Sequence, residues 1–191
     1  MLQETALSSP MIARSERLTE VEFERFYEQT ITGLWRYVHQ LVGDTDLAKD
    51  IVQTAFIRFW EHPPHREHEQ NLKAYLYRIA TNLAYDEFRK QKRRRRLLER
   101  LRRASRIKTE PSSYPNEPLY RALKRLSPRD RALLWLAYFE GYTYEEMASI
   151  LNLKTKSLGV LLYRARKRFE QCLRQCGYHP KPYQQADRGP K

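Results

Sequence analysis

A stripe of side chains suited to nucleic acid runs along one predicted helix in the first half of the chain. Arg78, Asn82, Tyr85 and Arg89 follow at spacings of four, three and four residues, which places them on one helix face. Arginine can contact a phosphate, an amide can hydrogen-bond a base edge, and a tyrosine ring can stack on an unpaired base. A charged stripe is often only a solvated face. This one leads directly into the basic run 89–96, which favours nucleic-acid binding.

A second constellation near the C-terminus has the pattern of a helix-turn-helix. Thr143 and Glu146 form a capping box that predicts a short helix, and a turn through residues 153–155 leads to a long basic helix over about 156–175. In a helix-turn-helix the start of the second helix enters the major groove. The pattern also fits an ordinary helical hairpin. The formal charge of +13, from 36 Lys and Arg against 23 Asp and Glu, favours the DNA-binding interpretation.

A third stripe has the opposite character. Asp46, Asp50 and Gln53 line one side of a predicted helix, and their acidic and polar side chains would repel DNA. They suit a basic protein partner, although a plain solvated face fits equally well.

The elements that position these residues are all helical. Thr19, Asp44 and Asn71 are predicted caps of three helices, of which Gly43 and the prolines at 63 and 64 end the first two. The sequence therefore predicts an all-α fold of two small helical domains joined by a flexible linker, the second domain with a helix-turn-helix. The predicted boundaries are an N-terminal tail at 1–18, domains at 19–101 and 117–176, a linker at 102–116 and a C-terminal tail at 177–191.

Several function classes are disfavoured by composition. The chain has no apolar run long enough for a membrane span, and its two cysteines do not form a disulfide framework, so a cytoplasmic protein is expected. No cluster of carboxylates and no nucleophile–base pair suggests an enzyme, and no cofactor is expected. Two groups of possible metal ligands are considered too sparse or too solvated, so no metal site is predicted: His62, His65 and His68, and Cys172, Cys176 and His179.

Three segments together resemble the extracytoplasmic-function (ECF) sigma factors, the small two-domain sigma subunits of bacterial RNA polymerase. Residues 46–60, DLAKDIVQTAFIRFW, resemble the second conserved region of the family, and residues 72–86, LKAYLYRIATNLAYD, resemble its promoter −10 helix. The segments LSPRDR at 126–131, EGYTYEEMA at 140–148 and YRAR at 163–166 resemble its −35 domain. The resemblance covers roughly residues 21–172, in the order of the family.

The resemblance implies a sigma factor that binds core RNA polymerase and directs −10 and −35 recognition and DNA melting for transcription initiation. It implies no catalysis by the chain itself, and it leaves an anti-sigma factor open as a further partner. The loop 62–70 corresponds to the family's capture site for a flipped-out base. The polymerase-binding residues would be Asp46, Asp50, Gln53 and Phe56. The −10 residues would be Arg78, Asn82, Asp86 and Arg89, to which the stripe adds Tyr85. The −35 residues would be Lys154, Lys156, Ser157, Tyr163, Arg164 and Lys167.

The sequence departs from the family at two places. Lys49 and Thr54 stand where an acidic residue is usual, and Leu158-Gly159-Val160-Leu161 stands where basic or hydroxyl side chains commonly face DNA. The second departure predicts fewer direct base contacts at the −35 element. Two other classes remain open from the residues alone: a stand-alone helix-turn-helix repressor and a nucleic-acid-processing enzyme.

Overall fold

A computed structural model describes residues 18–64, 71–101 and 118–178 of the chain, which within these ranges forms seven α-helices and no strand. The first three helices are α1 (Glu20–Val42), α2 (Thr45–Glu61) and α3 (Leu72–Leu101). The other four are α4 (Pro118–Arg125), α5 (Pro128–Tyr138), α6 (Tyr144–Leu151) and α7 (Thr155–Gln175). The all-α prediction is confirmed. The predicted linker lies outside the described residues, as do most of both predicted tails.

Short-range signals in the sequence set the helix ends. The Thr19 side chain accepts from the N–H of Glu22, and the Glu22 carboxylate accepts from Thr19 N–H at 2.8 Å, so the predicted capping box is present. Gly43 ends α1 with φ at +73°, a left-handed conformation that glycine adopts without a Cβ penalty. Asp44 caps α2 through Leu47 N–H at 2.9 Å, and Asn71 caps α3 through Ala74 N–H at 2.9 Å.

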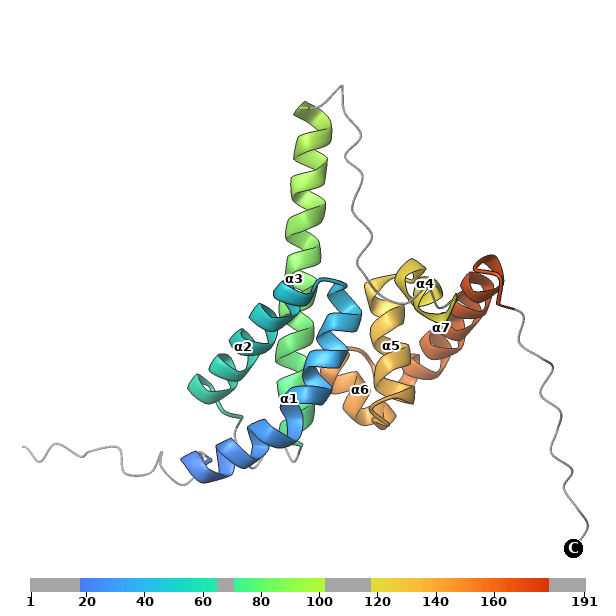
Figure 1. Ribbon diagram of the computed structural model, residues 1–191. Helices are drawn as coiled ribbons and strands as arrows, with labels where there is room; N and C mark the ends of the chain where they lie inside the picture. Colours follow the sequence, from blue (N-terminus) through green and yellow to red (C-terminus); the bar gives the residue numbers. More distant parts are fainter. Residues whose placement is uncertain (1–17, 65–70, 102–117, 179–191) are drawn as a thin grey trace, which may run out of the picture.

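Helices α1, α2 and α3 pack into the first domain around a core of aliphatic and aromatic residues. At its centre the rings of Tyr37 and Tyr77 stack at 5.2 Å, and the Tyr37 hydroxyl hydrogen-bonds Thr81 Oγ1 at 2.7 Å. Gly33 permits this packing, because a Cβ there would lie 3.0 Å from the Tyr77 hydroxyl. The second half of α3 projects beyond the body of the molecule (Figure 1), and its residues 89–96 are exposed.

Helices α4 to α7 form the second domain. Ser127 caps α5 with Pro128 as the first helical residue, and Thr143 with Glu146 forms the second predicted capping box. Asn152 ends α6 in a left-handed conformation, φ 51°, and Leu153 N–H donates to Ala148 O at 2.9 Å. This tight turn delivers the chain into α7 and completes the helix-turn-helix.

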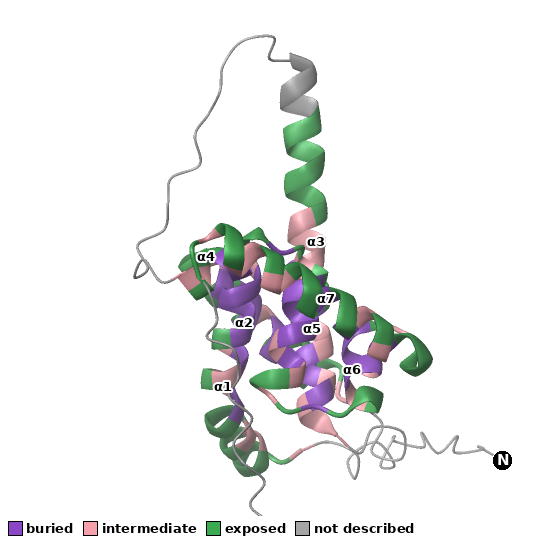
Figure 2. Ribbon diagram, turned by 90° about the vertical axis from the view of Figure 1, so that its right-hand side faces the viewer, coloured by how far each residue is buried: buried purple, intermediate pink, exposed green. Residues whose placement is uncertain are grey.

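The two domains pack directly against each other, which the sequence did not predict. Helix α3 lies against α6 and α1 against α5, so the buried residues form one continuous core in the middle of the molecule (Figure 2). Arg131 of α5 reaches across and donates to the carbonyls of Gln40 and Leu41 at 2.9 and 2.8 Å. The Lys73 ammonium pairs with the Glu140 carboxylate at 3.1 Å. Charged contacts therefore accompany apolar packing along this interface.

No helix in the described part of the chain is both long enough and apolar enough to cross a bilayer.

Candidate functional site

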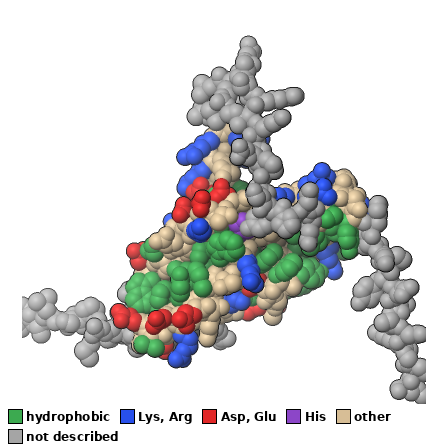
Figure 3. Space-filling view, viewed as in Figure 1, with side chains coloured by type: hydrophobic (Ala, Val, Ile, Leu, Met, Phe, Trp, Pro, Cys, Tyr) green, Lys and Arg blue, Asp and Glu red, His purple; other side chains and the backbone are tan. Residues whose placement is uncertain are grey.

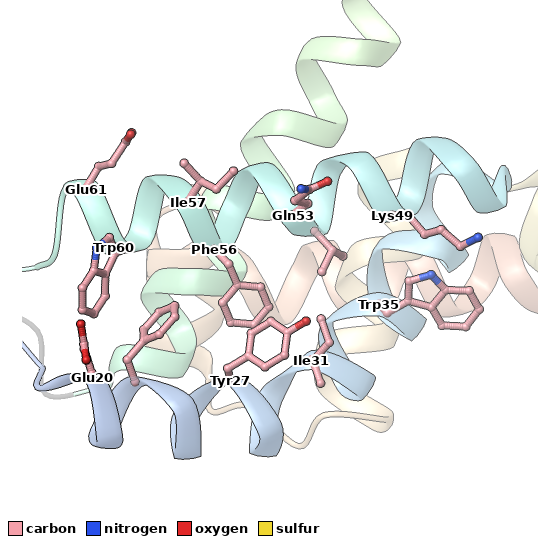
Figure 4. Close-up of a pocket in the computed structure, with 12 residues that line it drawn as sticks. Glu20, Tyr27, Ile31, Trp35, Lys49, Gln53, Phe56, Ile57, Trp60 and Glu61 are labelled. Atoms are coloured by element: carbon pink, nitrogen blue, oxygen red, sulfur yellow. The ribbon is translucent and has the colours of Figure 1, made fainter.

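An apolar groove lies between α1 and α2, with a cavity volume of about 760 Å³. Aromatic contacts hold its two sides together, Phe23 with Trp60 at 4.8 Å and Tyr27 with Phe56 at 4.7 Å between ring centroids. Figure 4 shows Tyr27, Phe56 and Trp60 between the two helices, with Glu20 and Glu61 at one end. The groove is lined by Glu20, Phe23, Tyr27, Ile31, Trp35, Lys49, Val52, Gln53, Phe56, Ile57, Trp60 and Glu61.

The groove is open and unusually apolar for a surface. Trp60, Ile57 and Tyr27 are 42%, 49% and 42% exposed, and together they form a contiguous patch that water must cover in the free protein. Hydrophobic side chains gather over α1 and α2 in the space-filling view, with acidic side chains at the edges (Figure 3). Exposed apolar patches with a charged rim are typical of surfaces that bind another protein.

The four residues predicted to bind polymerase all lie on α2 but differ in exposure. Asp46 and Asp50 are exposed near the start of α2, where Asp46 pairs with Lys49 at 3.6 Å. Gln53 is exposed on the groove wall, whereas Phe56 is 5% exposed and forms its floor. Sequence reasoning missed Ile57 and Trp60. The signal was available: both are large apolar residues on α2 that lie off its core-facing stripe.

The predicted −10 stripe on α3 is divided by the second domain. Asn82 and Arg89 are exposed, and Asp86 forms an ion pair with Arg89 one turn away. The hydrogen bond from Arg89 is the main cause that lowers the pKa of Asp86. On the solvent side, α3 therefore presents an amide next to a carboxylate–guanidinium pair.

The other two members of the stripe are partly covered, and Arg78 contacts the second domain. Arg78 Nη1 donates to Ser149 Oγ of α6 at 3.4 Å, and its guanidinium lies 4.9 Å from the centroid of the Tyr75 ring. Tyr85 is largely covered, and this burial raises the pKa of its hydroxyl to about 12, with Arg129 at the start of α5 opposing the shift. The Tyr85 hydroxyl has no hydrogen-bond partner among the described residues. In this arrangement neither side chain is fully available to a ligand.

The predicted −35 residues, by contrast, all lie on the solvent side of α7 or at its cap. The opposite side of the helix is buried through Leu158, Leu162 and Ala165, which pack with Met147, Ala148 and Leu151 of α6 in the common core. All six predicted −35 residues are exposed: Lys154, Lys156, Ser157, Tyr163, Arg164 and Lys167. The helix begins at Thr155, one residue before the predicted start, and Lys154 caps it without a side-chain hydrogen bond.

The possible metal ligands remain dispersed within the described residues. His62 is exposed, and Cys172 and Cys176 are free thiols of intermediate burial. No group of three or more potential ligands occurs in residues 18–64, 71–101 and 118–178. His65, His68 and His179 lie outside the described residues, as does most of the predicted base-capture loop at 62–70.

Comparison with known protein families gives two matches that follow the two domains. The family described as Sigma-70 region 2 matches residues 26–94, and the family described as Sigma-70, region 4 matches residues 116–169. The chain is 30% identical over 137 residues to the RNA polymerase sigma factor SigV of Bacillus subtilis, covering 70% of this chain and 80% of SigV. It is 27% identical over 157 residues to the ECF RNA polymerase sigma factor SigL of Mycobacterium tuberculosis, covering 79% and 88%.

A solved structure shares the fold. The sigma factor RpoE of Bartonella quintana, in complex with the anti-sigma factor NepR, superposes with a TM-score of 0.63 at 24% sequence identity. The similarity covers 80% of this chain and 96% of that one.

Proposed function

The chain belongs to the extracytoplasmic-function sigma factors, and from this premise we propose that three separate surfaces divide its work in directing promoter recognition. The α1–α2 groove with Asp46, Asp50 and Gln53 binds core RNA polymerase. Helix α3 holds the melted −10 strand, and α7 reads the −35 duplex. The observation that carries the proposal is that different kinds of side chain occupy different surfaces. An apolar groove with acidic edges lies between α1 and α2, and six exposed basic, hydroxyl or phenol side chains lie on α7 and at its N-cap.

The groove suits a polymerase element better than it suits DNA. Its centre is apolar, and the carboxylates at its edges would repel phosphates but attract a basic helix. Aromatic side chains such as Trp60 and Tyr27 provide large contact areas with little rotamer entropy to lose, which is typical of residues that dominate protein interfaces. Phe56 supports this contact from below, since it forms the floor of the groove.

Helix α3 offers groups that recognise an unpaired strand. Asn82 can hydrogen-bond an exposed base edge, Arg78 and Arg89 can bind phosphates, and Tyr85 can stack on a base. Unpairing a base costs a few kcal/mol, which such contacts must offset. Asp86 keeps the Arg89 guanidinium oriented through their ion pair.

This role requires the two domains to separate. Arg78 donates to Ser149 of α6 and Tyr85 is largely covered when the domains are packed together, so a strand cannot reach Arg78 freely until α6 moves away. The groove on α2 and the exposed side of α7 remain accessible in the same packed form. We infer that polymerase binding precedes opening and holds the domains apart. Both DNA contacts then benefit from effective concentration on one enzyme.

The chain itself catalyses no reaction in this proposal, because polymerase makes the phosphodiester bonds while this subunit supplies position and strand opening. It acts in the cytoplasm, where the polymerase and its template are.

The polymerase contact is tested by Asp50→Arg, which reverses an exposed charge on α2. We expect a large loss of affinity for core polymerase, measured by fluorescence anisotropy of labelled chain. Glu28→Arg is the matched control, since Glu28 is also an exposed acid of the first domain but lies on α1 rather than α2. If the two variants bind core polymerase with equal affinity, α2 is not part of the polymerase interface.

The division of DNA contacts is tested by Asn82→Ala in reconstituted initiation. We expect opening of the −10 region, followed by permanganate reactivity of unpaired thymines, to fall while binding of a duplex −35 element is retained. Lys156→Ala should instead weaken binding of the −35 duplex while opening of the −10 region is retained. If both variants impair both steps equally, α3 and α7 do not have the separate roles proposed here.

A further inference from the structure

The exposed stripe of α7 is not uniformly polar. Lys156, Val160, Tyr163 and Lys167 follow at spacings of four, three and four residues, so they share one face of the helix. Val160 is 53% exposed and Tyr163 is 55% exposed. An apolar side chain therefore lies on a face whose other members are two lysines and a tyrosine, one turn beyond the helix start that enters the groove in helix-turn-helix proteins.

Gly159, next to Val160, has no packing reason to be glycine. A Cβ there would meet only the Tyr144 ring, at 3.9 Å, which is ordinary contact, and the residue is in regular helix. Gly33 in α1 is the contrasting case, since its missing side chain admits the Tyr77 hydroxyl. Alanine at 159 would favour the helix. Because glycine has no side chain, the backbone beside Val160 is left uncovered, and an external molecule can approach it closely.

The neighbouring charges indicate which molecule this is. Lys154, Lys156, Arg164 and Lys167 surround the pair and are all exposed. Within α7 itself the single acid is Glu170, which pairs with Lys167 at 3.5 Å. A face with this excess of cations fits the phosphates on both sides of a duplex groove better than it fits a protein.

Valine cannot read hydrogen-bond donors or acceptors. The apolar group that a base pair offers in the major groove is the 5-methyl group of thymine. We propose that Val160 is a specificity-determining residue that contacts a thymine methyl group in the −35 duplex, with Gly159 permitting the close approach. The inference rests on the proposed role of α7 in −35 binding.

The test removes the methyl group and nothing else. The full chain with core polymerase is placed on a promoter from which it initiates, and each thymine of both −35 strands is replaced in turn by deoxyuridine. At one position we expect promoter affinity to fall roughly fourfold, the factor for one buried methyl group. Val160→Ala should bind the thymine and uracil duplexes equally, whereas Val160→Ile should still prefer thymine.

The outcomes separate this inference from the function on which it rests. If no uracil substitution distinguishes the wild-type chain from Val160→Ala, the methyl contact is refuted while −35 binding by α7 stands. Lys156→Ala should weaken the thymine and uracil duplexes by the same factor, because a phosphate contact does not sense the methyl group. If Lys156→Ala and Arg164→Ala leave promoter affinity unchanged, α7 is not the DNA-binding helix and the proposed function itself fails.

Discussion

Arg131 holds the two domains together through hydrogen bonds to backbone carbonyls. Its buried guanidinium donates to Gln40 and Leu41 in the last turn of α1 and to Lys124 and Leu126 at 3.1 and 3.2 Å within its own domain. Carbonyls in the last turn of a helix lack intrahelical donors and carry partial negative charge, so a cation stabilises them. The guanidinium thus links the C-terminal ends of α1 and α4.

We expect Arg131→Met to weaken this link by about 3 kcal/mol. A hydrogen bond with one charged partner contributes roughly 1.5 kcal/mol at the lower end, and two of the four bonds cross between domains. A loss of about 3 kcal/mol shifts the ratio of packed to separated domains by roughly a hundredfold. The two bonds within the second domain should add a smaller loss in its own stability.

Two measurements check this expectation on the full chain. Urea denaturation followed by circular dichroism gives the free energy of unfolding, and small-angle scattering gives the radius of gyration, which should increase when the domains separate. Separation should also improve binding of a single-stranded −10 oligonucleotide, because Arg78 and Tyr85 become accessible. Arg129→Met is the matched control, since Arg129 is exposed on the same helix turn and lacks these carbonyl contacts. Equal stability and equal radius for the two variants would refute the reasoning.

Three further predictions concern other parts of the molecule. Trp60→Ala should weaken binding to core polymerase at least tenfold with little loss of helix content, whereas Val21→Ala, at an exposed apolar residue outside the groove, should not; equal effects would argue against the groove. Gly159→Ala should raise the free energy of unfolding by about 1 kcal/mol in thermal denaturation, and a decrease would show that the glycine is needed for packing. Burial, and then the positive charge of Lys124, lower the pKa of His39, so the unfolded chain binds its proton more readily and stability should decrease as pH falls through about 6.5. His39→Gln should flatten that dependence in denaturation at several pH values, and an unchanged slope would exclude His39 as its source.

The parts of the fold that depend on neighbouring residues were predictable from the sequence. Thr19, Asp44, Asn71 and Thr143 cap the helices that they were predicted to cap, because a capping side chain and its backbone partner lie two or three residues apart. The exposed face of α7 was predictable for the same reason, since helical spacing decides which residues lie opposite Leu158 and Leu162.

Contacts between the domains could not be predicted in this way. Arg131 and Gln40 are 91 residues apart, and Lys73 and Glu140 are 67 residues apart. No local pattern distinguishes these side chains from ordinary surface charges. The division of the α3 stripe follows from the same long-range packing, because Arg78 reaches Ser149 of α6 and Tyr85 is largely covered, whereas Asn82 is exposed.

The packed arrangement also constrains the order in which the three surfaces can be used. In one and the same conformation the groove on α2 and the polar side of α7 are exposed, while half of the α3 stripe is covered. A ligand favours the conformation to which it binds more tightly. Under the proposed function, a −10 strand would therefore shift the chain towards the separated form, and its affinity would be lowered by the free energy of separating the domains. A partner that binds α2 and the second domain together only in the separated form would supply the free energy of separation instead. Isolated chain should therefore bind a −10 single strand weakly and gain affinity when core polymerase is added. A free chain that binds the strand as tightly as the polymerase-bound chain would mean that the domain contact does not limit access to α3.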